Sequence, residues 1–168
     1  MAKASEVIGR AVVAREGGKE LGRIKDLVVD PAGKQVLGFV VSEGPLRSTK
    51  VAAWPALQAI GPDSVVLNAA ESVVKADDAP DIKSVLDLDL RINGLRLHTT
   101  EGKDLGKIED FLFDDQTGAV QGYELSGGFF ADAFGGRSFL PVPTSIELGK
   151  DLAFVGPEAE ATIQRSGG

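Results

Sequence analysis

The sequence contains no cysteine and a single histidine, His98. The lack of cysteine excludes a disulfide framework, a thiolate zinc site and a cysteine nucleophile. A lone histidine offers no second imidazole for a metal centre, and no serine or threonine near it belongs to a nucleophile motif that would need a general base. We expect His98 on the exposed face of a strand, and we expect no catalytic residue, cofactor or metal.

Basic residues are few: 18 Lys and Arg stand against 25 Asp and Glu, for a formal net charge of -7. Affinity for nucleic acid depends on cations that neutralise phosphates, so direct binding to nucleic acid is not favoured. Long apolar runs are also missing, and residues 1–6 lack the apolar stretch of a signal peptide. We therefore expect a cytoplasmic protein without a transmembrane segment.

A twelve-residue motif occurs twice. Residues 19–30 read KELGRIKDLVVD, residues 103–114 read KDLGKIEDFLFD, and six of the twelve positions are identical. Average composition would give roughly one identity by chance in such a window. The chain is therefore predicted to contain an internal duplication, with Gly22 and Asp26 equivalent to Gly106 and Asp110.

The 21 glycines and 8 prolines indicate many turns between short strands. In the first copy we predict a strand at 7–14 and a long motif strand at 21–29, with a bulge near Asp26 that restores the inward register. Further strands are predicted at 35–42, 51–55 and 64–68, with a helical turn or link at 57–60. The second copy repeats this order.

The predicted architecture is all-β, with two small tandem barrels. Repeat 1 spans residues 4–69 and repeat 2 spans 89–156, with an acidic linker at 70–88 and a polar tail at 157–168. Residues 82–86 of the linker could form a helical turn. Domains this small bury a modest share of their surface, so the repeats should pack against each other or against a second chain.

These features together resemble a known family. A Gly-Arg/Lys-Ile-x-Asp strand, an Asp-containing turn, an apolar strand with a glycine, a Trp-Pro or Val-Pro step and a closing Gly-x-Asp strand are similar to the PRC-barrel domain. That small β-barrel also occurs in the cytoplasmic part of the photosynthetic reaction centre H subunit and in the C-terminal half of a ribosome maturation factor. The resemblance implies a barrel that binds other proteins and has no catalytic residues.

Asp26 and Asp110 could be paired catalytic acids, but their recurrence in two barrels favours a shared structural task. A carboxylate at a bulge can accept backbone N–H groups that the barrel corner leaves open. Likewise, the acidic turn around Asp114 and Asp115 lacks the spacing of a calcium loop and is interpreted as solvated. Trp54 is expected in the core.

The most informative stretch is 126–139, which places four phenylalanines between and beside two Gly-Gly pairs. They are Phe129, Phe130, Phe134 and Phe139. Aromatic side chains in a loop should meet either their own barrel or a partner, which could be a second copy of this chain. Peripheral membrane contact is a weaker alternative, because the loop has few cations for anionic lipid.

The sequence thus favours a non-enzymatic protein-binding or scaffold module. An assembly factor for ribosomes or RNA processing, acting through protein contacts, is the second hypothesis. An enzyme is the third, and a cluster of polar side chains in a deep pocket would support it.

The aromatic stretch gives a first testable prediction. Phe129→Ser combined with Phe130→Ser is expected to weaken self-association or capture of a partner, because it removes apolar contact area while both barrels stay folded. Molar mass from light scattering coupled to size exclusion, over a range of concentrations, measures the effect. Unfolding of repeat 2 in the double variant would instead identify these rings as core.

Overall fold

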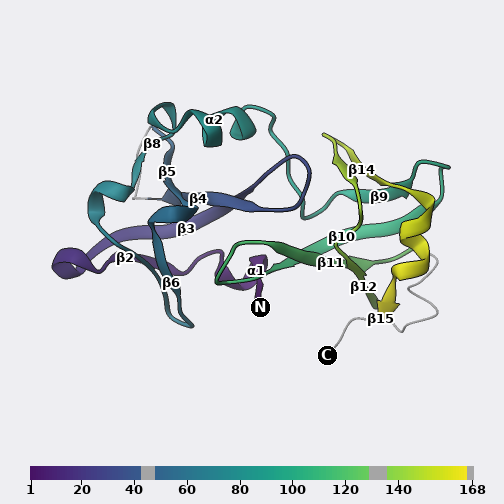
Figure 1. Ribbon diagram of the computed structural model, residues 1–168, viewed down its shortest axis with the longest axis horizontal. Helices are drawn as coiled ribbons and strands as arrows, with labels where there is room; N and C mark the ends of the chain where they lie inside the picture. Colours follow the sequence, from purple (N-terminus) through teal and green to yellow (C-terminus); the bar gives the residue numbers. More distant parts are fainter. Residues whose placement is uncertain (43–47, 129–135, 166–168) are drawn as a thin grey trace.

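The computed structural model describes residues 1–42, 48–128 and 136–165. Each repeat forms one β-sheet, and the two sheets lie side by side along the long axis of the molecule (Figure 1). The sheet of repeat 1 contains β2 (Ala11–Ala14), β3 (Lys19–Val29), β4 (Val36–Ser42), β5 (Lys50–Ala53), β6 (Leu57–Ile60), β7 (Ser64–Leu67) and β8 (Val74–Lys75). The sheet of repeat 2 contains β9 (Arg96–Thr99), β10 (Asp104–Phe113), β11 (Val120–Ser126), β12 (Arg137–Pro141), β13 (Ile146–Leu148), β14 (Leu152–Val155) and β15 (Gln164–Arg165).

Short helices connect the strands. They are α1 (Ala4–Val7), α2 (Pro80–Leu86) and the 3-10 turns η1 (Glu16–Gly18), η2 (Trp54–Ala56), η3 (Ala70–Ser72), η4 (Ala76–Asp78) and η5 (Pro157–Thr162). Within the part of the chain that the structure describes, no helix is long and apolar enough to cross a membrane.

The two sheets have the same strand order. In repeat 1 it is β6-β7-β2-β3-β4-β5-β8, and in repeat 2 it is β13-β14-β9-β10-β11-β12-β15. In both, the first strand of the repeat runs parallel to the closing strand, as β2 does to β7 and β9 does to β14. The all-β tandem fold predicted from the duplication is confirmed.

Strands β3 and β10 form the centre of each sheet, and both are bulged where the sequence predicts. The register shifts between Ile24 and Asp26 in β3, and between Ile108 and Asp110 in β10. After the bulge in β3, Leu27 and Val29 are buried. The extra residue therefore turns the apolar side chains back toward the core.

Three local predictions differ from the structure. The predicted strand at 7–14 begins only at Ala11, because α1 and a turn at Gly9 (φ +95°) precede it. Residues 57–60 form the edge strand β6 and not a helical turn, since their backbone pairs with β7. The polar tail is structured as far as Arg165: η5 buries Ala159, and β15 pairs with β12.

The two repeats share one hydrophobic core, which runs from Ala4 to Ile163 and includes the largest side chains of both sheets. At the junction, Gln35 and Ala119 form an antiparallel bridge, with Val36 N donating to Gly118 O (2.8 Å) and Val120 N donating to Lys34 O (2.9 Å). These residues are equivalent in the two copies, so the repeats meet across a pseudo-twofold axis.

Aromatic side chains close the junction. Trp54 is half-buried, stacks on Phe39 of its own repeat and meets Phe113 of repeat 2 edge-on, with ring centroids 5.8 and 6.2 Å apart. The hydroxyl of buried Tyr123 donates to Gly33 O of repeat 1 (2.7 Å). Burial raises the pKa of Tyr123 well above its ordinary value, and the charge of Asp30 adds to this shift, so the hydroxyl stays protonated as a donor.

Candidate functional site

The aromatic stretch is described only in part. Phe129, Phe130 and Phe134 lie outside the described residues. Phe139 belongs to β12, where it is half-buried and its ring lies over Gly122 of the neighbouring strand. Phe139 therefore packs on its own repeat, and the site that the described residues reveal lies elsewhere.

That site is the part of β10 that extends beyond its pairing with β9, where the chain's own N-terminal segment binds. We call residues 2–7 the N-terminal arm; it consists of β1 (Ala2–Lys3) and α1. Although the arm leads into repeat 1, β1 pairs with β10 of repeat 2, with Ala2 opposite Phe113 and Lys3 opposite Leu112. In Figure 1 the N-terminus and α1 lie beside the strands of repeat 2. Ala4 and Val7 are fully buried in the shared core.

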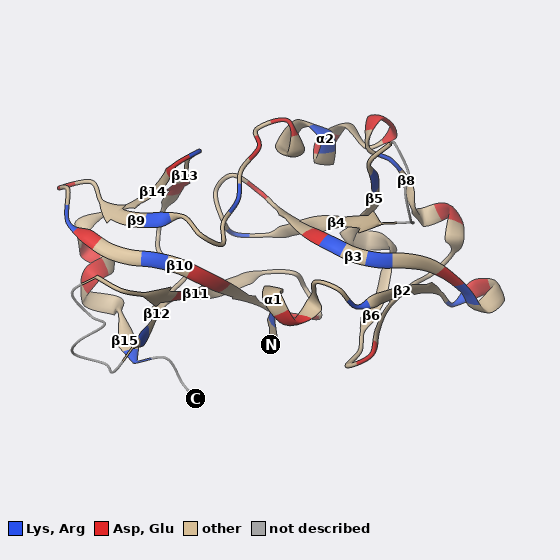
Figure 2. Cartoon of the chain, turned by 180° about the vertical axis from the view of Figure 1, so that it is seen from behind, with Lys and Arg blue, Asp and Glu red and all other residues tan. Residues whose placement is uncertain are grey.

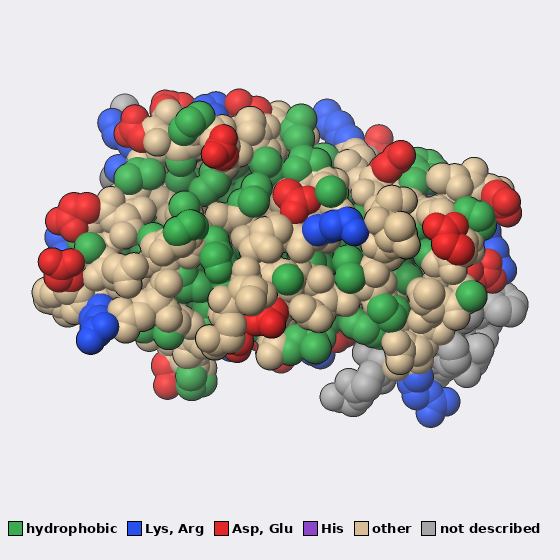
Figure 3. Space-filling model, viewed as in Figure 1, with side chains coloured by type: hydrophobic (Ala, Val, Ile, Leu, Met, Phe, Trp, Pro, Cys, Tyr) green, Lys and Arg blue, Asp and Glu red, His purple; other side chains and the backbone are tan. Residues whose placement is uncertain are grey.

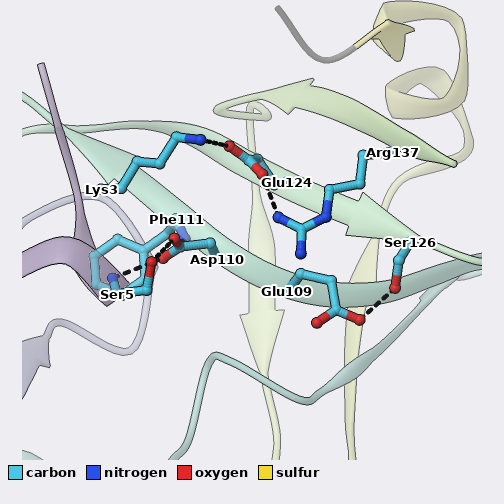
Figure 4. A network of polar contacts seen from close by, with 8 residues as sticks. All are labelled: Lys3, Ser5, Glu109, Asp110, Phe111, Glu124, Ser126 and Arg137. Carbon is cyan, nitrogen blue, oxygen red and sulfur yellow. Dashed lines mark hydrogen bonds and ion pairs between the residues drawn. The ribbon is translucent and has the colours of Figure 1, made fainter. Parts of the chain in front are cut away.

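Asp110 anchors the arm by a set of hydrogen bonds to one buried carboxylate. The side chain accepts Phe111 N (2.9 Å) in the bulge, as the repeated motif suggests, and it also accepts the backbone N (3.1 Å) and the hydroxyl of Ser5 (Figure 4). Asp110 is only 3% exposed. Its carboxylate thus joins the bulge of repeat 2 to the arm.

A second carboxylate binds the arm through charge. Glu124 of β11 has a side chain only 4% exposed, and it pairs with Lys3 (2.8 Å) and Arg137 (2.9 Å) (Figure 4). Burial alone would raise the pKa of Glu124, but its hydrogen bonds and charge contacts with the two cations outweigh burial and hold that pKa below its ordinary value. Both cations remain partly in contact with water.

Sequence reasoning missed Glu124 and the arm. The available signal was a difference between the copies. Glu124 in the second copy stands at the position of Val40 in the first, so a carboxylate replaces an apolar side chain. Pairing of β1 with β10 is the main-chain contact by which a sheet edge takes up an extended segment, while Ser5 reaches Asp110 from the first turn of α1.

The other candidate residues have local partners. His98 on β9 lies edge-on to Phe154, with ring centroids 6.4 Å apart, and is half-buried. Asp114 accepts the backbone N of Gln116 (2.7 Å) and of Thr117 (3.2 Å) within its own turn. Among the residues described, no group of three or more His, Asp or Glu side chains could hold a metal ion.

The motif glycines Gly22 and Gly106 have positive φ angles, +137° and +110°. A Cβ atom at either position would collide with the backbone of the adjacent strand, at Ser42 in repeat 1 and at Ser126 in repeat 2. These glycines are therefore structural, because they allow close approach of the neighbouring strand at the start of the bulged segment.

Duplicated sheets of this kind, centred on a bulged Gly-x-Ile-x-Asp strand, define a class of small tandem β-barrels. The profile of the PRC-barrel domain matches residues 1–73 and 90–160, and the chain belongs to the PRC-barrel family. Domains of this family are general protein-interaction modules and are generally non-catalytic. No curated protein gives a significant match to the sequence.

The two equivalent aspartates provide a matched pair of variants. Asp110→Ala is expected to lower the free energy of unfolding by about 1 to 3 kcal/mol, because it leaves Phe111 N and Ser5 N without their acceptor in a buried site. Asp26→Ala should cost less, since Asp26 is exposed and water can replace its carboxylate. Urea denaturation of both variants measures the difference, and equal costs would contradict the anchoring role of Asp110.

The lowered pKa of Glu124 gives a pH-dependent prediction. Because the folded-state pKa lies below the ordinary value of 4.5, the ion pairs stabilise the fold above that value and are lost as the pH falls through the folded-state pKa. Glu124→Gln should therefore cost about 1 kcal/mol near pH 7, and the difference from wild type should shrink as the pH falls below 4.5.

Thermal melts at several pH values compare this variant with Glu147→Gln, which changes an exposed side chain on β13 and should be neutral at every pH. A cost for Glu124→Gln that stays constant down to pH 2 would contradict the assignment.

Proposed function

We propose that this protein is a non-enzymatic, cytoplasmic protein-binding or scaffold module. Its barrels act by accepting an extended segment of polypeptide at the free edge of the bulged central strand. The partner is a protein, which includes the case of a second copy of this chain.

One observation carries the proposal: β10 of repeat 2 already holds a segment that its own repeat does not supply. The N-terminal arm extends the sheet by β1, and its contacts combine pairing of the main chain with side-chain recognition by Asp110 and Glu124. Strand addition of this type gives affinity through the backbone and specificity through alternate side chains. The central strand is bulged in the same place in both repeats, so its geometry is a property of the barrel.

The charge distribution supports a protein partner over nucleic acid. Acidic and basic residues both occur along β3 and along β10 (Figure 2), and on the face shown in Figure 3 charged side chains of both signs are interspersed with hydrophobic side chains that reach the surface. Neither view has the continuous basic stripe that phosphate binding requires.

The proposal is tested by separating the arm from the folded chain. A protease recognition sequence replaces the turn at Ile8 and Gly9, where Ile8 is exposed and Gly9 has open space around it. The full chain is folded first and then cut. A labelled synthetic copy of residues 1–8 is expected to exchange into the vacated edge and bind saturably, one peptide to each chain.

Specificity is checked with peptide variants. A peptide in which Ser5 is Ala loses the hydroxyl contact to Asp110 and should bind roughly tenfold more weakly, the factor for one hydrogen bond to a charged group. A peptide in which Glu6 is Gln is the control, because α1 carries that exposed side chain on its outer surface. Absence of binding to a cut chain that keeps its circular dichroism spectrum would overturn the proposal.

A further inference from the structure

A short hinge, residues 8–10, joins the N-terminal arm to repeat 1. Gly9 has a φ of +95°, and its N–H donates to Ile24 O of β3 (2.8 Å), so repeat 1 holds this residue in place. Across the hinge, the structure describes one backbone hydrogen bond back to the arm, from Arg10 N to Val7 O (3.1 Å). The chain between Val7 and Gly9 is therefore the point at which the arm can turn away from its own repeat.

The polar contacts that hold the arm are made instead with repeat 2. β1 pairs with β10, and Ser5 donates to Asp110. Lys3 pairs with Glu124. Every copy of this chain carries the same arm and the same β10, so an arm from a second copy would make all of these contacts again. The closed chain and a pair of chains with swapped arms then differ mainly in the hinge and in the entropy of association.

The length of the hinge fixes how two copies could meet. From Val7 to Ala11, four residue steps span at most roughly 14 Å in an extended chain. An arm can therefore reach β10 of a second copy only where the two hinges come close together. In Figures 1 and 2 the N-terminus and α1 lie at the margin of the molecule, where a second copy can approach. Ile8, a large hydrophobic side chain that is 38% exposed, would then meet the other hinge.

We propose that the partner of the β10 site is a second copy of this chain, and that two copies swap their N-terminal arms to form a dimer with twofold symmetry. Each β10 pairs with β1 of the other copy, and each hinge is extended. This inference rests on the proposed function and names its partner. The closed form prevails in dilute solution, because a tethered arm has an effective concentration of the order of millimolar.

A turn in repeat 2 provides the control for the hinge. Gly94 is equivalent to Gly9, with a φ of +101°, and its N–H donates to Ile108 O of β10 (2.7 Å). A Cβ atom at either glycine would meet nothing within 4 Å. The stretch before Gly94 cannot be swapped alone, since it is joined to α2, whose buried Ile82 packs over Gly38 of repeat 1.

The first test is Gly9→Val. Valine disfavours the positive φ of the closed hinge but fits an extended hinge and keeps the N–H, so it penalises the closed form alone. With a penalty of roughly tenfold at each of two hinges, the association constant of the dimer should rise about a hundredfold. Gly94→Val introduces the same strain at a turn that the swap leaves unchanged, and should stay monomeric. Sedimentation equilibrium measures both variants.

Isotope labelling identifies which copy supplies the arm. A Gly9→Val dimer is prepared from equal amounts of labelled and unlabelled chains, and isotope-filtered NOEs should join residues 2–5 of one copy to residues 111–113 of the other. Adding Ile8→Ser should lower the association constant severalfold, because it removes the apolar contact between hinges. Leu88→Ser, which changes another exposed side chain far from the hinge, should leave the association constant unchanged.

A second measurement avoids the strained variant, in case Gly9→Val fails to fold. Labelled and unlabelled wild-type chains are mixed at millimolar concentration, held a few degrees below the melting temperature so that arms detach, and then cooled and diluted. Size exclusion should yield a dimer fraction with the same NOEs between copies.

The outcomes separate the swap from the proposed function. A folded Gly9→Val chain that stays monomeric at millimolar concentration overturns the swap, and so does a dimer whose NOEs join the arm to β10 only within one copy. Equal dimerisation of Gly94→Val also overturns it, since association would then follow from lost stability and not from the hinge. In each of these cases, binding of the arm peptide to the cut chain of the previous section leaves the proposed function standing, with a different protein as partner. Failure of the cut chain to bind that peptide overturns both.

Discussion

The reciprocal bridge between Gln35 and Ala119 is the constraint on which the rest of the structure depends. Each residue immediately precedes the second long strand of its repeat, and two backbone hydrogen bonds, from Val36 N and from Val120 N, join the two segments in antiparallel fashion. Two copies of one fold that meet through equivalent residues must be related by a near twofold rotation. The shared core then follows, because each sheet presents its open side to the other.

This rotation also brings the start of each repeat to the central strand of the other. The N-terminal arm, which precedes β2, lies on β10, and residues 89–92, which precede β9, line a cleft beside β3. This exchange ties the two repeats together, since Ala4 and Val7 are buried in the core that both repeats form. Neither repeat would have a complete core alone, as expected for domains this small.

Much of the fold could be predicted from local pattern. The repeated Gly-x-Ile-x-Asp motif located the central strands and their bulges, because a bulge has a local cause: apolar residues fall out of alternation at Asp26 and again at Asp110. The edge strand β6 could not be predicted in the same way. Two of its four residues are exposed and two are half-buried, without alternation, and only pairing with β7 makes them a strand.

The candidate site was out of reach of the sequence for a different reason. Nothing in residues 2–7 specifies which sheet the arm joins; that choice is made by the geometry of the junction far away in the chain. The role of Asp110 at the bulge was visible because it repeats, whereas its contact with Ser5 does not repeat. Sequence comparison within the chain reveals what the copies share, and binding specificity arises where they differ.

Divergence between the copies explains why the two central strands are covered in different ways. In repeat 1, α2 covers the outer face of the sheet, and Ile82 packs over Gly38 within an apolar cluster that includes Val40. In repeat 2 the equivalent glycine, Gly122, is covered by Phe139, and Glu124 in place of Val40 recruits Lys3 and Arg137. A buried carboxylate is costly without its cations, so Glu124 requires the arm to stay bound. No comparable demand exists at Val40, whose side chain packs with Val28 and Ile82 in the apolar cluster under α2.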